Sequence, residues 1–101
     1  MRLSDFEVDT IRKAVHRRFG DGSRVLLFGS RADDRRRGGD IDLLVETGET
    51  GTEAFQHKLE ALTDMHLAFG ERKIDLVTAP PTGVQDERPI VRIARETGIA
   101  L

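Results

Sequence analysis

Three short apolar runs, each bounded by turn-forming residues, most constrain what this chain can fold into. Residues 24–28 (RVLLF) lie between Gly-Asp-Gly and Gly-Ser, and residues 41–45 (IDLLV) follow a pair of glycines and an aspartate. Residues 73–78 (KIDLVT) end at Ala-Pro-Pro. Short runs rich in Val, Leu, Ile and Phe with such boundaries predict buried strands. We therefore expect a small sheet.

Helical periodicity surrounds and separates these strands. The first helix begins with Ser4 and Glu7 at capping-box spacing, the second covers residues 52–69, and the last covers about residues 88–97. The expected apolar stripes are Val8, Ile11, Val15 and Phe19 in the first helix, and Phe55, Leu59, Leu62, Met65 or His66, and Phe69 in the second. The order α-β-β-α-β-α, with helices covering a small mixed sheet, predicts a two-layer α/β arrangement of the α+β class.

Length and composition limit the function. At 101 residues the chain is expected to form a single domain, residues 1–101. Its formal net charge is -2, so composition does not favour direct binding to nucleic acid or to an anionic membrane. The chain has no cysteine, which excludes disulfides and thiolate metal sites. It has no apolar stretch long enough for a signal peptide or a membrane span, so we expect a cytoplasmic protein.

Asp40 and Asp42 stand two positions apart at the start of the second apolar run. In a strand, both side chains point to the same face, about 6.5 Å apart at the backbone, so both carboxylates can reach one small site. Neighbouring carboxylates repel each other unless a cation or water separates them, and Mg²⁺ prefers hard oxygen ligands of this kind. Solvated aspartates at a turn would give the same spacing. The pair alone therefore leaves both interpretations open.

Two further features of the sequence bear on this pair. Gly29 and Ser30 follow the first strand. A glycine there lets the backbone approach a ligand, and a serine offers a hydroxyl to a phosphate, with an ordinary helix N-cap as the alternative. Asp75 lies inside the third apolar run, where a carboxylate needs compensation. If the second and third strands are neighbours, three carboxylates meet at one point, as two-metal phosphoryl or nucleotidyl transfer requires.

The stretch LFGSRADDRRRGGDIDLLV resembles the Gly-Ser…Asp-x-Asp signature of the polymerase-beta-like nucleotidyltransferase superfamily. Over nearly its whole length, including the closing IVRIARETGIAL, the chain resembles the minimal nucleotidyltransferases (MNT). The resemblance implies that Asp40, Asp42 and Asp75 are catalytic and bind divalent metal, two Mg²⁺ ions or Mn²⁺ in their place. It also implies that a nucleoside monophosphate is moved from ATP or another NTP onto a hydroxyl.

The same resemblance assigns nucleotide binding to Gly29 and Ser30, with Arg31 and Gly39 beside them. Gly39 stands where many members have a serine, so a contact from that hydroxyl is missing. Arg31 could contact a phosphate or pair with a nearby aspartate at the surface.

Three other features are interpreted more simply. The run of arginines at 35–37 could attract a nucleotide, but it lacks the aromatic neighbours that would stack on bases, which favours a solvated loop. Glu46 is in register with the aspartate pair and is interpreted as the exposed end of its strand. His66 lies on or beside an apolar stripe and is interpreted as a partly buried histidine.

Two functional hypotheses follow. The first is a metal-dependent enzyme that transfers AMP from ATP to a hydroxyl on a partner protein. The resemblance implies that this partner is small and helical, either a HEPN-type toxin neutralised by this chain as its antitoxin or a substrate-binding subunit. The second is a binding subunit with little or no catalysis. Because residues 99–101 (IAL) have no evident core position, we expect this apolar edge to dock the partner or a second copy.

Overall fold

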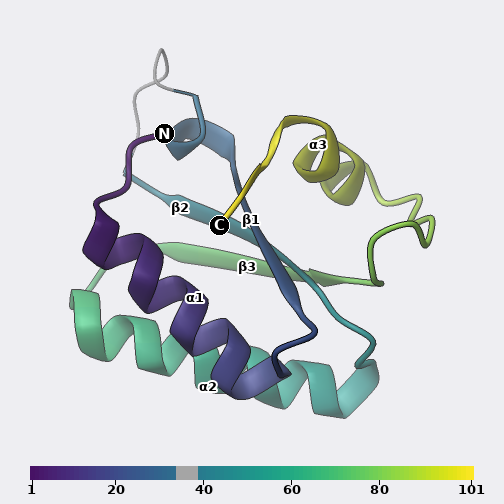
Figure 1. Cartoon of the computed structure of the whole chain (residues 1–101), viewed down its shortest axis with the longest axis horizontal. Coiled ribbons are helices and arrows are strands. Elements are labelled where there is room, and N and C mark those ends of the chain that lie inside the picture. Colours follow the sequence, from purple (N-terminus) through teal and green to yellow (C-terminus); the bar gives the residue numbers. More distant parts are fainter. Residues whose placement is uncertain (34–38) are drawn as a thin grey trace.

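The computed structural model describes residues 1–33 and 39–101. This part of the chain contains the helices α1 (Asp5–Phe19), α2 (Gly51–Phe69) and α3 (Pro89–Thr97). It also contains the strands β1 (Arg24–Phe28), β2 (Ile41–Glu46), β3 (Ile74–Ala79) and β4 (Ile99–Ala100), with a short 3-10 helix, η1 (Gly29–Arg31), after β1. The predicted α+β class and the order α-β-β-α-β-α are confirmed, and β4 is an addition to them (Figure 1).

The strands form one mixed sheet in the order β3-β2-β1-β4. Strand β1 pairs antiparallel with both β2 and β4, whereas β2 and β3 are parallel. Parallel neighbours need a long crossover connection, and α2 supplies it. The last residues of β1 and the first residues of β2 and β3 consequently lie at the same end of the sheet.

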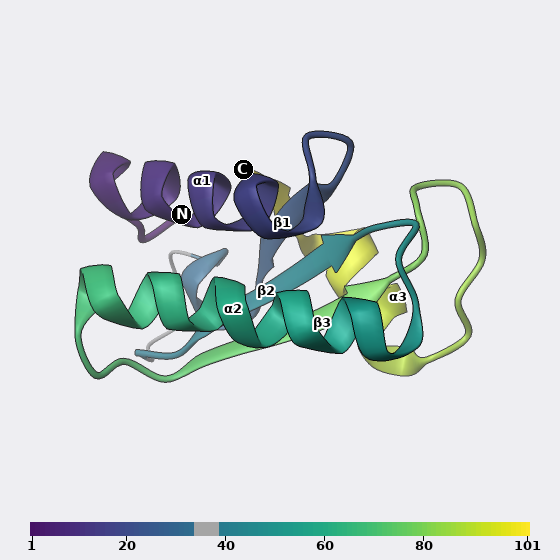
Figure 2. The ribbon, with the colours of Figure 1, turned by 90° about the horizontal axis from the view of Figure 1, so that it is seen from below.

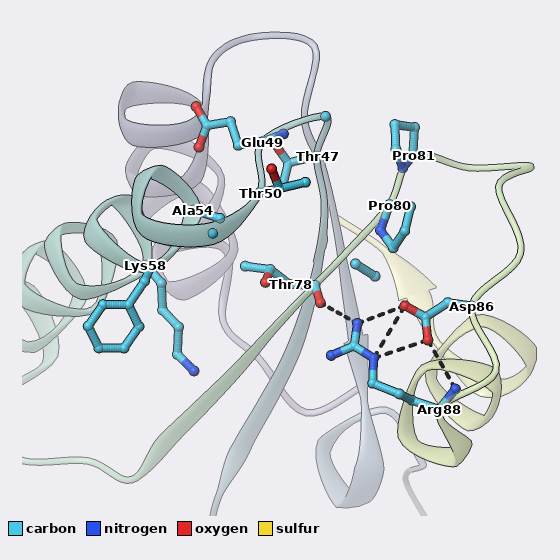
Figure 3. A pocket seen from close by; sticks show the side chains of 14 residues that line it. Thr47, Glu49, Thr50, Ala54, Lys58, Thr78, Pro80, Pro81, Asp86 and Arg88 are labelled. Atoms are coloured by element: carbon cyan, nitrogen blue, oxygen red, sulfur yellow. Dashed lines mark hydrogen bonds and ion pairs between the residues drawn. The ribbon is translucent and has the colours of Figure 1, made fainter.

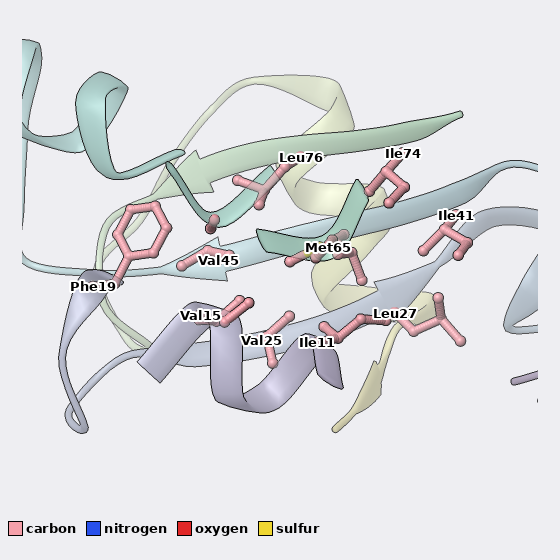
Figure 4. Packing of buried hydrophobic residues seen from close by; sticks show 13 residues of the cluster. Ile11, Val15, Phe19, Val25, Leu27, Ile41, Val45, Met65, Ile74 and Leu76 are labelled. Carbon is pink, nitrogen blue, oxygen red and sulfur yellow. The ribbon is translucent and has the colours of Figure 1, made fainter. Parts of the chain in front are cut away.

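The two faces of the sheet are covered unequally. Helices α1 and α2 lie side by side across one face (Figures 1 and 2), and the main core fills the space between them and the strands (Figure 4). On the other face a smaller cluster forms where Val91 and Ala94 of α3 pack on Leu26 and Leu44. Since α3 has only nine residues, it covers a limited part of this face.

The predicted start of α1 is confirmed. The Ser4 hydroxyl accepts a hydrogen bond from the Glu7 N–H (3.1 Å), and the Glu7 carboxylate accepts one from the Ser4 N–H (2.9 Å). Glu7 also forms an ion pair with Arg72, which precedes β3. These contacts lower the pKa of the Glu7 carboxyl despite its burial, because hydrogen bonds and the nearby cation favour the charged form.

The predicted apolar stripe of α2 is confirmed at Met65, which is buried, and at Leu62 and Phe69, which pack against the main core, but not at Phe55 and Leu59. The buried residues of the helix are Ala54, Ala61 and Met65, whereas Phe55 and Leu59 are 59% and 48% exposed. The prediction of a partly buried His66 is wrong, because this side chain is exposed. Small alanines let α2 pack close to its neighbours, so the helix turns these residues inward and leaves larger apolar side chains outside.

The expectation that the last three residues lack a core position holds for Ile99 and Ala100, which are exposed, and is wrong for Leu101. Ile99 and Ala100 form β4 on the free side of β1, and the Leu101 N–H donates to the Val25 carbonyl at 3.0 Å. Leu101 also packs against the main core. Gly98 makes this turn possible, because a Cβ at this position would overlap the Ala94 carbonyl oxygen.

Glu46 is not at an exposed strand end, as the sequence suggested, but is 3% exposed. Its carboxylate accepts hydrogen bonds from Thr82 (2.7 Å), Arg95 (3.0 Å) and Arg24 (3.4 Å). The prediction failed because the chain after β3 folds back over the end of β2, and α3 brings Arg95 with it.

Two remaining expectations concern the loop and the membrane. The arginine run at 35–37 lies outside the described residues. Of the helices that the structure describes, none has the length and apolar character needed to cross a membrane.

Candidate functional site

Asp42 and Asp75 lie side by side at the open end of the sheet. They are register partners on the parallel strands β2 and β3. Asp40 immediately precedes β2 and, by strand alternation, shares their face. On its other side Asp42 is paired with Phe28, the last residue of β1. The structure therefore brings Asp42 and Asp75 together on the face that carries α3, with Asp40 close enough to raise the pKa of the Asp42 carboxyl.

The electrostatics of this group are unfavourable to charge. Burial raises the pKa of the Asp42 carboxyl, and the neighbouring carboxylates of Asp75 and Asp40 raise it further. Lys73 acts in the opposite direction, and its Nζ lies 3.5 Å from the Asp40 Oδ2. A carboxylate whose charge is opposed by two other carboxylates is a place where a cation would be stabilised.

The donor atoms fit a hard divalent cation, because they are carboxylate oxygens on adjacent strands. Asp40, Asp42 and Asp75 are the residues that could hold such an ion. Within residues 1–33 and 39–101, however, no three acidic or histidine side chains are already arranged to hold a metal ion. Asp40 would have to turn from Lys73 toward Asp42 and Asp75 to complete the ligand set.

Gly29 places the end of β1 directly against the Asp42 carboxylate. Its φ is +74°, a conformation that favours glycine, and a Cβ at this position would overlap the Asp42 Oδ2. No other residue type combines this backbone conformation with the room that Asp42 needs. The turn and the aspartate are therefore fitted to each other.

The other predicted nucleotide-binding residues form a network around this turn. Arg31 donates to the carbonyl oxygens of Arg2 (2.9 Å) and Gly39 (3.0 Å), and Arg2 donates to the Ser30 carbonyl (3.0 Å). Arg31 thus links the start of the chain to the segment just before β2. Ser30 is half-buried within η1. The roles of these residues toward a phosphate stay predictions.

A pocket of about 430 Å³ lies at the opposite end of β2 and β3 (Figure 3). It is lined by residues 47–51 after β2, by the first turns of α2 and by Thr78, Pro80 and Asp86. Arg88 closes one side, where it donates to Asp86 and to the Thr78 carbonyl oxygen. This pocket is distant in the fold from Asp42 and Asp75, so its size does not identify the site of chemistry.

A family model described as the nucleotidyltransferase domain matches residues 8–100. The match covers nearly the whole chain, so the chain belongs to the nucleotidyltransferase domain family and is a transferase of nucleotidyl groups. A search of curated proteins finds no match.

The sequence patterns did not single out Lys73, which the structure places at this site. Lys73 stands two positions before Asp75, just as Asp40 stands two before Asp42. That spacing was the available signal, since it places Lys73 on the same face of β3 once the strand is assigned.

Proposed function

We propose that this chain is a divalent-cation-dependent nucleotidyltransferase that moves AMP from ATP onto a hydroxyl group of a partner protein. The observation that carries the proposal is the register of Asp42 and Asp75 on neighbouring parallel strands, with the Gly29 turn fitted against Asp42. Membership of the nucleotidyltransferase family supports the reaction class. Family membership does not specify ATP, the cation or the protein acceptor, and these are proposed here in addition to the reaction class.

Asp40, Asp42 and Asp75 would hold Mg²⁺, which when bound neutralises charge on the triphosphate and on the transition state. Gly29 and Ser30 would bind the β- and γ-phosphates. Asp75 is exposed at the outer strand of the sheet, so it would orient the acceptor hydroxyl and accept its proton. The hydroxyl oxygen forms a bond to the α-phosphorus, the bond from that phosphorus to the bridging oxygen breaks, and pyrophosphate leaves.

The open position of the site supports a protein acceptor. Asp75 is exposed, and the Asp40 side chain is 48% exposed. The same face carries α3, on which Ile90 and Ile93 are 42% and 52% exposed. Apolar side chains beside an open polar site suit a partner that covers both. We propose a small helical partner, either a HEPN-type toxin that this chain neutralises as an antitoxin or a substrate-binding subunit.

A binding subunit without catalysis is the second candidate. The observation that favours it is the ion pair between Asp40 and Lys73, which leaves the three aspartates short of a complete ligand set. In that case the exposed apolar side chains of α2 and α3 would bind the partner, and no group would be transferred.

The two candidates are separated by capturing the partner from native cells and measuring its intact mass after incubation with ATP and Mg²⁺. We expect the partner to gain one or more adenylyl groups with the natural chain and none with Asp42→Asn. GTP, CTP and UTP in parallel reactions identify the preferred nucleotide. A captured partner whose mass never changes would favour the binding subunit. A chain that fails to bind any NTP with Mg²⁺ in calorimetry would contradict the enzymatic proposal.

A further inference from the structure

Lys73 and the three aspartates form two neighbouring pairs across β2 and β3, Asp42 with Asp75 and Asp40 with Lys73. Asp42 and Asp75 are register partners, and the Ile41 N–H donates to the Lys73 carbonyl at 3.1 Å, which places Lys73 beside Asp40, two residues before that pair. Lys73 and Asp75 are two positions apart and therefore share a face, as Asp40 and Asp42 do. The 3.5 Å distance from the Lys73 Nζ to the Asp40 Oδ2 shows that the ammonium group reaches the aspartate that precedes β2.

The other lysines of the chain are elsewhere. Lys13 pairs with Asp9 on α1 at 2.9 Å, and Lys58 lines the pocket at the opposite end of the sheet. Arg31, an arginine of the described part of the chain that lies near the site, donates to two backbone carbonyls. Lys73 is thus the lysine whose ammonium group stands at the aspartates.

The ion pair between Lys73 and Asp40 is easily exchanged. The two side chains are 68% and 48% exposed, and pairs with such exposure contribute little to stability. A divalent cation carries twice the charge of an ammonium group and prefers the same carboxylate oxygens. The flexible lysine stem keeps the ammonium group close after it leaves Asp40, with three N–H donors free for an anion.

We propose that Lys73 is a further binding residue of this site: it holds Asp40 in the nucleotide-free protein, yields Asp40 to the divalent cation, and then binds the triphosphate. The inference rests on the proposed function, because it needs both ligands at one site. It predicts effects of opposite sign for the two ligands when the ammonium group is removed. A merely structural lysine would not produce that pattern.

The test compares Lys73→Met with Lys58→Met, which removes the same charge from the other end of the sheet. Binding of Mn²⁺ alone is measured from the free-ion signal in electron paramagnetic resonance, and binding of ATP with Mg²⁺ is measured by calorimetry. We expect Lys73→Met to bind Mn²⁺ about two- to fivefold more tightly, because no exposed ion pair has to be broken. We expect it to bind ATP about tenfold or more weakly, because a charge-assisted contact is lost.

Lys58→Met is expected to match the natural chain in both measurements, and Lys73→Arg is expected to retain ATP binding. If Lys73→Met binds Mn²⁺ as tightly as the natural chain does, and ATP likewise, the inference about Lys73 is overturned while the proposed function stands. A parallel loss of both affinities, accompanied by a lower melting temperature, would also overturn the inference and assign Lys73 a structural role. If the natural chain binds neither Mn²⁺ nor ATP, the proposed function fails and the inference fails with it.

Discussion

Strand β2 carries a carboxylate at each end of the same face, and the two have opposite surroundings. Glu46, at the end covered by α3, accepts hydrogen bonds from Arg24, Arg95 and Thr82 and is almost fully buried. Asp42, at the open end, has a second carboxylate as its neighbour on β3 and a phenylalanine as its neighbour on β1. The charge of Glu46 is neutralised by arginines, whereas the charge of Asp42 is opposed by other carboxylates.

An apolar row separates the two ends. Leu26, Leu44 and Val77 are register neighbours on β1, β2 and β3, and α3 packs over them. Burial of this row lets the same small face keep a carboxylate with arginine partners at one end and a group of mutually repelling carboxylates at the other. A buried carboxylate with arginine partners therefore holds the fold together, whereas carboxylates that face one another at the open end of the sheet are available to a ligand.

Replacing Asp42 should affect activity far more strongly than replacing Glu46. Asp42→Asn should reduce nucleotidyl transfer by at least about a hundredfold, because it removes a group that stabilises the transition state. Its stability should stay equal to that of the natural chain or rise slightly, since one of several repelling charges is gone. Transfer is followed by mass spectrometry of the acceptor, and unfolding by circular dichroism in urea. Full activity in this variant would remove Asp42 from the chemistry.

The second prediction concerns the other end of the strand. Glu46→Gln should lower the free energy of unfolding by about 3 kcal/mol, because Arg24 and Arg95 lose their anionic partner in a buried place. Activity per folded molecule should not change. The matched control is Glu96→Gln on the exposed side of α3, where we expect a change within about 0.5 kcal/mol. If Glu46→Gln instead abolished transfer while remaining fully stable, the assignment of a structural role to this end of β2 would be incorrect.

A smaller effect is expected at the turn that faces Asp42. Gly29→Ala should cost about 1–3 kcal/mol of stability for its positive φ and should also reduce ATP binding, because the new Cβ displaces the Asp42 carboxylate. Gly20→Ala is the control, since Gly20 has a φ of +97° but a Cβ there would meet no atom within 4 Å. It should lose stability without losing ATP binding. Equal ATP affinities in the two variants would show that the close fit of Gly29 and Asp42 is irrelevant to the nucleotide.

The fold was largely predictable from the sequence because its signals are local. Short apolar runs bounded by glycine and proline predicted β1, β2 and β3 to within a residue or two at each end, and the Ser4–Glu7 spacing predicted the start of α1. The short strand β4 was not predictable in this way. Two residues carry no periodicity, and their pairing with β1 depends on the turn at Gly98.

The site was predictable only in its parts. Alternation along a strand placed Asp40 and Asp42 on one face, and an aspartate within an apolar run singled out Asp75. The environment of each charge depends on segments distant in sequence. Glu46 is buried by Arg95, 49 residues later, and Arg31 is bound to the carbonyl of Arg2, 29 residues earlier. No local pattern encodes such contacts, so the interpretation of Glu46 as exposed was wrong.

The smallest expected effect is on the pH dependence of stability. Burial and the neighbouring carboxylates raise the pKa of Asp42 above its ordinary value of 3.8, so the folded state binds this proton more tightly than the unfolded state does. The stability contributed by the protonated form is therefore present below pH 3.8 and is lost as the pH rises through the higher pKa of the folded protein. Asp42→Asn has no such loss, so its advantage over the natural chain should grow with pH across that window.

Asp64 is the matched control, because its pKa is shifted in the opposite direction to that of Asp42. Hydrogen bonds from Arg18 lower the pKa of the Asp64 carboxyl, so its contribution to stability is present above the ordinary pKa and is lost as the pH falls through the folded one. Asp64→Asn should therefore be less stable than the natural chain at neutral pH and approach it in acid. Urea unfolding at several pH values between 3 and 7 measures both differences. If the two variants shifted with pH in the same direction, the contrast between a carboxylate that has an arginine partner and one that faces other carboxylates would not hold.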